Sequence, residues 1–185
     1  MSRLRFNTAT EVFEMFPSAR KVVGMPPAPA EHPLAYLQRL ARSAGAGDAL
    51  AFCAFLLPRR EAVWWGLQTV RATQAPGTSD AGLAAAEAWV RDPGDRARFE
   101  ALATAQDGDP DQPGTWVAWA AGYSGGSMVA GHAIPCPPDL TAKMVRIGVL
   151  TAINRLPPRD RDGALRRSIE ACIRLTDDDA GRSRA

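Results

Sequence analysis

The chain has 185 residues, of which 46% are hydrophobic and 23% are charged. This composition is that of a folded domain and excludes a wholly disordered chain, and the length suffices to bury a core without a metal or disulfide staple. The 22 basic and 20 acidic residues leave a net charge of +2, which is too small to steer nucleic acids or anionic lipids. We therefore expect no nucleic-acid partner.

The first 31 residues are predicted to form a short helical hook and a proline-rich tether. Thr8 and Glu11 have the spacing of a capping box, and Pro17 ends the apolar pattern that follows. Residues 24–30 contain closely spaced prolines, which hold the backbone extended. This segment shows none of the apolar length of a secretory signal.

From residue 32 to residue 176 the apolar spacing is helical almost throughout, and no stretch alternates as a strand does. Residues 49–57 are apolar all round, which predicts a central buried helix capped by Asp48. Pro58 can begin the next helix, residues 58–73, and Ser79 can cap the one after it. Further helices are expected to start near Pro93 and to cover residues 116–121, 140–153 and 165–173.

These patterns predict a single all-α domain, a globular bundle of about seven to eight helices over residues 32–176. The polar residues 177–185 are expected to form a disordered tail. The uncharged run 112–138 is interrupted by glycines and prolines, so no membrane span is expected there. The three cysteines, with their odd number and lack of C-x-x-C spacing, favour a reducing cytoplasm.

The segment Gly122-Tyr-Ser-Gly-Gly126 reads as the G-x-S-x-G of serine hydrolases, and His132 follows its serine by eight residues. A nucleophile elbow needs a strand before the serine and a helix after it, whereas here a helical segment leads in and a proline-rich loop leads out. A phosphate-binding loop would need a lysine that is absent from this run. We therefore predict a bend or surface loop, with ligand binding or hydrolysis by residues 124–136 as the alternative. The candidate ligand residues are Tyr123, Ser124, Gly125, Gly126, Ser127 and His132.

Two other patterns match metal sites only in part. Asp107, Asp109 and Asp111 alternate as in an EF-hand loop, but Gln112 and Ala118 stand where that loop needs its glycine and its bidentate glutamate. His132 and Cys136 together would give zinc only half of its ligands. We predict neither a metal nor another cofactor.

The helix expected after Pro58 combines charge with aromatic side chains, in Arg59, Arg60, Trp64 and Trp65. Adjacent residues lie about 100° apart on a helix, so both tryptophans are buried only if the helix is covered broadly. A protein-binding surface is the favoured use of this group. Single-stranded nucleic acid binding and simple core packing are the alternatives.

The segments LLPRREAVWWGLQTVR, AAEAWV and WVAWAAGYSGGSM resemble a family of uncharacterised, all-helical proteobacterial proteins associated with type VI secretion gene neighbourhoods. The resemblance covers residues 33–175, with its anchors at 58–65 and 124–127. It implies no activity and no catalytic residues. We expect a non-enzymatic, cytoplasmic adaptor or accessory protein of a bacterial, type VI-like secretion system, acting through protein–protein contacts.

Overall fold

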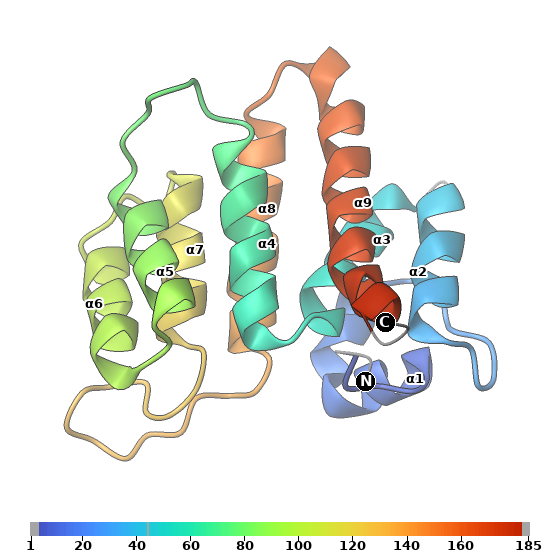
Figure 1. Ribbon diagram of the computed structural model, residues 1–185, viewed down its shortest axis with the longest axis horizontal. Coiled ribbons are helices and arrows are strands. Elements are labelled where there is room, and N and C mark those ends of the chain that lie inside the picture. The colour runs from blue at the N-terminus through green and yellow to red at the C-terminus, as the bar shows by residue number, and fades with distance from the viewer. Residues whose placement is uncertain (1–3, 44, 183–185) are drawn as a thin grey trace. The chain divides into compact units, whose positions relative to one another are not determined.

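The computed structural model describes residues 4–43 and 45–182, and all regular elements within these residues are helical (Figure 1). They comprise nine α-helices and one 3-10 helix, so the all-α prediction is confirmed. The count slightly exceeds the predicted seven to eight because the helix predicted as a separate hook adds to those of the bundle. Contacts divide the chain into two compact units. Unit 1 comprises the described residues before Arg59 and after Arg161, and unit 2 comprises Arg59–Arg161. The single bundle stays a prediction.

Unit 1 is built around an apolar helix. Its elements are α1 (Ala9–Met15), the 3-10 helix η1 (Pro17–Lys21), α2 (Pro33–Arg42), α3 (Ala46–Leu56) and most of α9 (Pro158–Arg182). Every residue of α3 from Ala49 onward is buried, which confirms the predicted buried helix. Its predicted cap is wrong, because Gly45 is the N-cap and the Asp48 carboxylate instead accepts a hydrogen bond from the Gly24 amide at 2.7 Å.

An aromatic cluster holds the helices of unit 1 together. The Tyr36 ring of α2 packs edge-on against Phe52 of α3 with centroids 4.8 Å apart, and Phe13 of α1 lies 5.8 Å from Phe52. All three side chains are buried. Aromatic pairs of this geometry stabilise by roughly 0.5–1.5 kcal/mol beyond their burial. The helix α1, whose Thr8 hydroxyl caps the Glu11 amide as predicted, is therefore an integral part of the unit 1 core.

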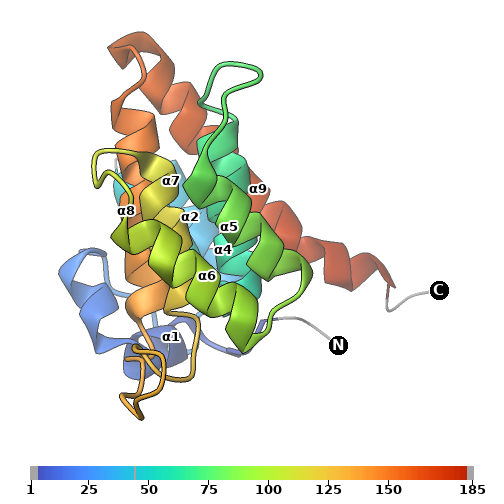
Figure 2. The ribbon, with the colours of Figure 1, turned by 90° about the vertical axis from the view of Figure 1, so that its left-hand side faces the viewer.

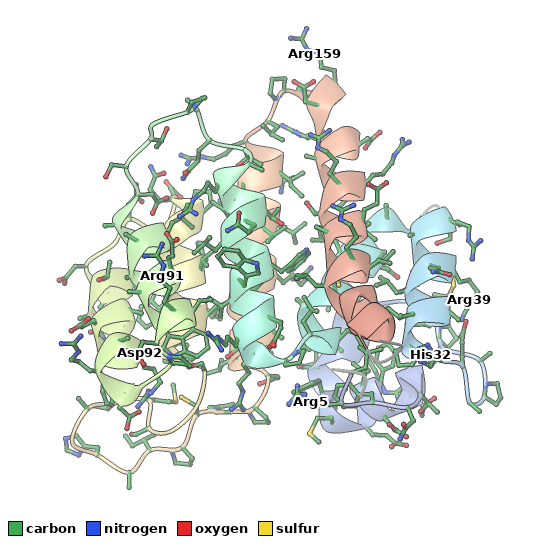
Figure 3. All side chains as sticks on the ribbon, viewed as in Figure 1. Arg5, His32, Arg39, Arg91, Asp92 and Arg159 are labelled. Atoms are coloured by element: carbon green, nitrogen blue, oxygen red, sulfur yellow. The ribbon has the colours of Figure 1, made fainter. Side chains whose placement is uncertain are left out.

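The proline-rich connector between η1 and α2 is fastened to α2 at two points. The Tyr36 hydroxyl donates a hydrogen bond to the Met25 carbonyl. The guanidinium of Arg39, a residue labelled in Figure 3, pairs with both carboxylate oxygens of Glu31, at 2.9 and 2.7 Å. The connector is thus bound at both ends by side chains of one helix.

The buried Tyr36 hydroxyl makes the stability of unit 1 sensitive to alkaline pH. Burial raises the pKa of Tyr36 to about 12, above its ordinary value near 10. Its contribution is therefore complete below about pH 10 and is lost as the pH rises toward about 12. We expect the free energy of unfolding to lose on the order of 2 kcal/mol over this window through Tyr36. Urea unfolding followed by circular dichroism measures this as the difference between the native chain and Tyr36→Phe. The assignment is wrong if the two pH profiles run parallel.

Unit 2 is arranged around α7. Its elements are α4 (Arg59–Arg71), α5 (Ala81–Arg91), α6 (Asp95–Gln106), α7 (Pro113–Gly122) and α8 (Leu140–Asn154). The helix α7 packs against all four others (Figures 1 and 2). It carries no charged residue and is buried on several faces, including Val117, Ala118 and Ala121. Small side chains allow this close packing, so the short predicted helix is the centre of the unit.

The first turns of α5 and α7 meet backbone to backbone. A Cβ atom added at Gly82 of α5 would lie 2.4 Å from the Gly114 carbonyl oxygen of α7, closer than any real contact allows. Asp80, not the predicted Ser79, caps α5 by accepting the Leu83 amide at 3.0 Å. The helix α6 begins at Asp95, two residues after the predicted start near Pro93, with Gly94 as its N-cap. The cap of α5 was mispredicted because Ser79 and Asp80 are adjacent and both are of a type that caps helices.

The last helix, α9, continues to Arg182, beyond the residue at which the helical domain was predicted to end. Residues 183–185 of the predicted tail lie outside the described residues. Within the part of the chain that the structure describes, no helix combines the length and the apolar character needed to cross a bilayer.

Candidate functional site

The segment 123–139, which we call the Gly-rich loop, joins the end of α7 to the start of α8 at one end of unit 2 (Figures 1 and 2). The loop folds back on itself as a small hairpin. Ser127 and Pro135 form an isolated bridge, the Met128 amide donates to the Ile134 carbonyl at 2.7 Å, and the Cys136 amide donates to the Gly126 carbonyl at 3.1 Å. Residues 129–135 at its tip are exposed.

The Ser127 side chain organises the tip of the hairpin from inside. Its hydroxyl accepts hydrogen bonds from the amides of Ile134 at 3.1 Å and Val129 at 3.3 Å. The same hydroxyl contacts the carbonyls of Val129 and His132 as a donor. The hydroxyl of Ser127 is therefore satisfied by the loop itself.

A buried arginine of α6 fixes the base of the loop. The Arg98 Nη1 atom donates to the carbonyls of Gly122 at 3.1 Å and Ser127 at 2.7 Å, while its Nε atom pairs with Asp95 at 3.0 Å. The Arg98 side chain is only 5% exposed, whereas the carboxylate partner is 79% exposed. A buried guanidinium needs such acceptors, because an unpaired charge in the interior is costly.

Gly126 is required at the turn beside this arginine. Its φ is +60°, in the left-handed region that residues with a Cβ atom seldom adopt. A Cβ atom added there would also lie 3.1 Å from Arg98 Nη2. The glycine therefore serves the backbone path of the loop, which explains the match to G-x-S-x-G without a nucleophile.

The residues of the predicted partner surface on α4 have different environments. Arg59 donates from Nη1 to the Ser124 carbonyl at 2.9 Å, and Arg60 donates from Nε to the Val90 carbonyl at 2.8 Å. Trp65 is 1% exposed and belongs to the core, whereas Trp64 is half-buried. Arg59 thus connects the predicted partner surface on α4 with the predicted ligand loop, two groups that sequence reasoning treats separately.

The base of the Gly-rich loop also contains two ionisable side chains. Burial raises the pKa of the Tyr123 hydroxyl. The ring of Tyr123 stacks on that of Trp119, with centroids 5.1 Å apart. Burial likewise raises the pKa of the half-buried Cys136 thiol, although Arg98 and Arg59 act in the opposite direction. Both groups are therefore neutral at physiological pH, and the positive charges at the base of the loop are those of Arg59 and Arg98, of which Arg98 is paired with Asp95.

The serine and histidine of the predicted ligand loop do not form a catalytic pair here. Ser124 is buried, and its carbonyl and amide bond Arg59 and Ala121. Among the described residues, the exposed His132 imidazole has no hydrogen bond to either serine. In the acidic loop, Asp109 accepts the Asp111 amide at 2.8 Å as an Asx turn. Across the described ranges, no three potential metal ligands come together.

Sequence reasoning did not identify Arg98. The signal was present, because the buried positions of α6 are Arg98, Ala101, Leu102 and Ala105, which follow the helical spacing of an inward face. An arginine on such a face has to find acceptors in the interior. The two exposed aliphatic side chains of the loop, Val129 and Ile134, were also not singled out.

Comparison with known proteins agrees with the extent of the resemblance seen in the sequence. A family model described as a family of unknown function (DUF6931) matches residues 36–176. The comparisons with curated proteins and with solved structures gave no match. Since the family model covers most of the chain, the protein belongs to the DUF6931 family.

Proposed function

We propose that the protein is a non-enzymatic adaptor that binds another protein through the exposed tip of the Gly-rich loop. The observation that carries this proposal is that polar groups of the loop are hydrogen-bonded while two of its aliphatic side chains are exposed. The Ser127 hydroxyl bonds within the loop and the carbonyls of Ser124 and Ser127 bond Arg59 and Arg98, whereas the side chains of Val129 and Ile134 are 43% and 47% exposed. A loop that is held at its base and presents aliphatic side chains suits a protein contact.

The chemistry of the loop indicates the kind of surface that it binds. A shallow hollow of about 300 Å³ lies beside the bridge between Ser127 and Pro135, lined also by Gly126, Ala133 and Ile134. The sequence has no formal charge between residues 112 and 138. The proposed partner therefore offers an uncharged patch with an aliphatic side chain that fills this hollow.

We further propose that this partner is a component of a type VI-like secretion system and that binding takes place in the bacterial cytoplasm. Support comes from the resemblance of residues 33–175 to proteins associated with such gene neighbourhoods and from the three cysteines, which form no disulfide. The exposed Arg60 and the half-buried Trp64 of α4 are the remaining candidates for a second contact.

The test starts with a tagged pull-down from the native producer, followed by titration of the purified partner against loop variants. We expect Val129→Ser with Ile134→Ser to weaken binding at least tenfold, because each buried aliphatic side chain contributes about 1.5–3 kcal/mol. Met15→Ser is the matched control, since Met15 is 54% exposed on α1. Trp64→Ala tests the α4 surface without disturbing buried Trp65.

Unchanged affinity in the double loop variant, while the partner stays bound, would rule out the loop as the contact. A partner that belongs to no secretion machine would contradict the type VI assignment alone. If Trp64→Ala and not the loop variant abolishes binding, the adaptor role holds on the α4 surface instead.

A further inference from the structure

A cavity of about 220 Å³ lies where α4 and α8 end and α7 begins, at the opposite end of α7 and α8 from the Gly-rich loop. The connection between α4 and α5 lies at this end of unit 2, as Figure 1 shows. Its volume is below the roughly 300–1,000 Å³ of pockets for drug-sized ligands. The size therefore suits a molecule no larger than an amino acid.

Two residues of the cavity lining, Arg155 and Gln112, offer hydrogen-bond donors. Arg155 donates from Nη1 to the Gln112 Oε1 atom at 2.9 Å. A guanidinium can only donate, so this bond fixes the oxygen of Gln112 and leaves its NH2 group as a second donor. Among the described residues, the Nε and Nη2 atoms of the exposed Arg155 have no partner. Paired donors with one positive charge match a carboxylate.

Two threonines of the lining offer hydrogen-bond acceptors. The Thr73 hydroxyl donates to the Val70 carbonyl and the Thr78 hydroxyl donates to the Ala75 carbonyl, both at 2.7 Å. The oxygen of each hydroxyl keeps lone pairs that can accept a hydrogen bond. These residues follow the C-terminal end of α4, where the helix dipole favours a cation. An ammonium group is a compact donor, and these hydroxyl oxygens can accept hydrogen bonds from it.

Gln74 also lines the cavity and donates from Nε2 to the Asp80 carboxylate at 2.8 Å, so its Oε1 atom is a further acceptor. The rest of the lining is apolar and consists of Ala75, Pro113, Ala152 and Leu156, of which Ala152 is buried. Donors, acceptors and aliphatic groups thus line one cavity, and these are the groups that an α-amino-acid site requires. We propose that it binds a small aliphatic α-amino acid, with the carboxylate at Arg155 and Gln112 and the ammonium at Thr73 and Thr78.

This site is separate from the Gly-rich loop, so its occupancy stands or falls independently of the proposed protein contact. The first experiment is isothermal titration of the full chain with glycine, alanine, valine and leucine. Their α-hydroxy acid and amine analogues serve as probes that lack one charged group. We expect at least one amino acid to bind, and both of its analogues to bind about tenfold more weakly or worse.

Variants locate the ligand. Arg155→Gln removes the carboxylate contact and is expected to weaken binding by about 10- to 100-fold. Ala75→Phe, at an exposed position of the lining, is expected to fill the cavity and abolish binding. Arg159→Gln is the matched control, because its side chain is 86% exposed, outside the lining (Figure 3).

Failure of all four amino acids to bind overturns the proposal. The same holds if an analogue binds as tightly as its amino acid, or if Arg159→Gln weakens binding as much as Arg155→Gln. Circular dichroism of each variant confirms that the chain has folded. If Arg155→Gln does not fold, Ala75→Phe decides, since retained affinity in that folded variant places the ligand elsewhere.

Discussion

Substitution of Gly82 by alanine is expected to destabilise unit 2 by about 3 kcal/mol. The added methyl would lie 2.4 Å from the Gly114 carbonyl oxygen and 2.8 Å from the Thr115 amide nitrogen. These are backbone atoms of the central helix, which cannot rotate away as a side chain could. Relief of the clash requires α5 to move off α7, so packing along their whole contact is weakened.

Urea unfolding followed by tryptophan fluorescence measures this change, because all five tryptophans lie in unit 2. The matched control is Gly47→Ala, which makes the same chemical change near the start of α3, where no atom lies within 4 Å. Because Gly47 belongs to unit 1, which has no tryptophan, unfolding of this variant is followed by circular dichroism. There alanine is expected to stabilise by about 0.5–1 kcal/mol through its helix propensity. Equal stability of Gly82→Ala and the native chain would mean that α5 and α7 are not in backbone contact.

Substitution of Arg98 by methionine is expected to destabilise unit 2 by about 2–4 kcal/mol and to release the base of the Gly-rich loop. Methionine retains the aliphatic volume but leaves the carbonyls of Gly122 and Ser127 without their charged donor. Because the Arg98 side chain is 5% exposed, water replaces that donor only if the loop opens. Limited proteolysis within residues 128–135 should therefore become faster, alongside the loss of stability.

Arg96→Met is the control for this experiment, since Arg96 lies on the same helix with its side chain 89% exposed. Its exposed pair with Glu100 contributes little, so the change is expected to stay within about 0.5 kcal/mol. Similar effects of the two substitutions, or proteolysis that stays slow in Arg98→Met, would contradict the role assigned to Arg98.

The helices of this protein could be predicted from the sequence because each has a local signal. The capping pair of Thr8 and Glu11, Pro33 at the start of α2 and the apolar run of α3 all act within a few residues. Choices between neighbouring caps depend on tertiary contacts. Asp48 is drawn away from its own helix start by the Gly24 amide, and Asp80 is engaged by Leu83 and Gln74.

The arrangement of the site could not be predicted in the same way, because its contacts are remote in sequence. Arg59 lies 65 residues from its partner Ser124, and Arg98 lies 29 residues from Ser127. The glycine pattern around Ser124 is typical both of a turn and of a nucleophile elbow, so the sequence alone does not distinguish them. Only the φ of Gly126 and the neighbouring guanidinium show that the glycines serve the turn.

The discontinuity of unit 1 has a consequence for the nascent chain. The helix α3 leaves the ribosome before unit 2, but α9, whose buried Cys172 belongs to the same unit as the buried Cys53 of α3, emerges only after the whole of unit 2. Unit 2 is continuous and can close during synthesis, whereas unit 1 must wait for α9. The helix α3, which is apolar on every side, is thus left partly uncovered while unit 2 is being made. During that interval α3 is a segment that a chaperone would have to shield.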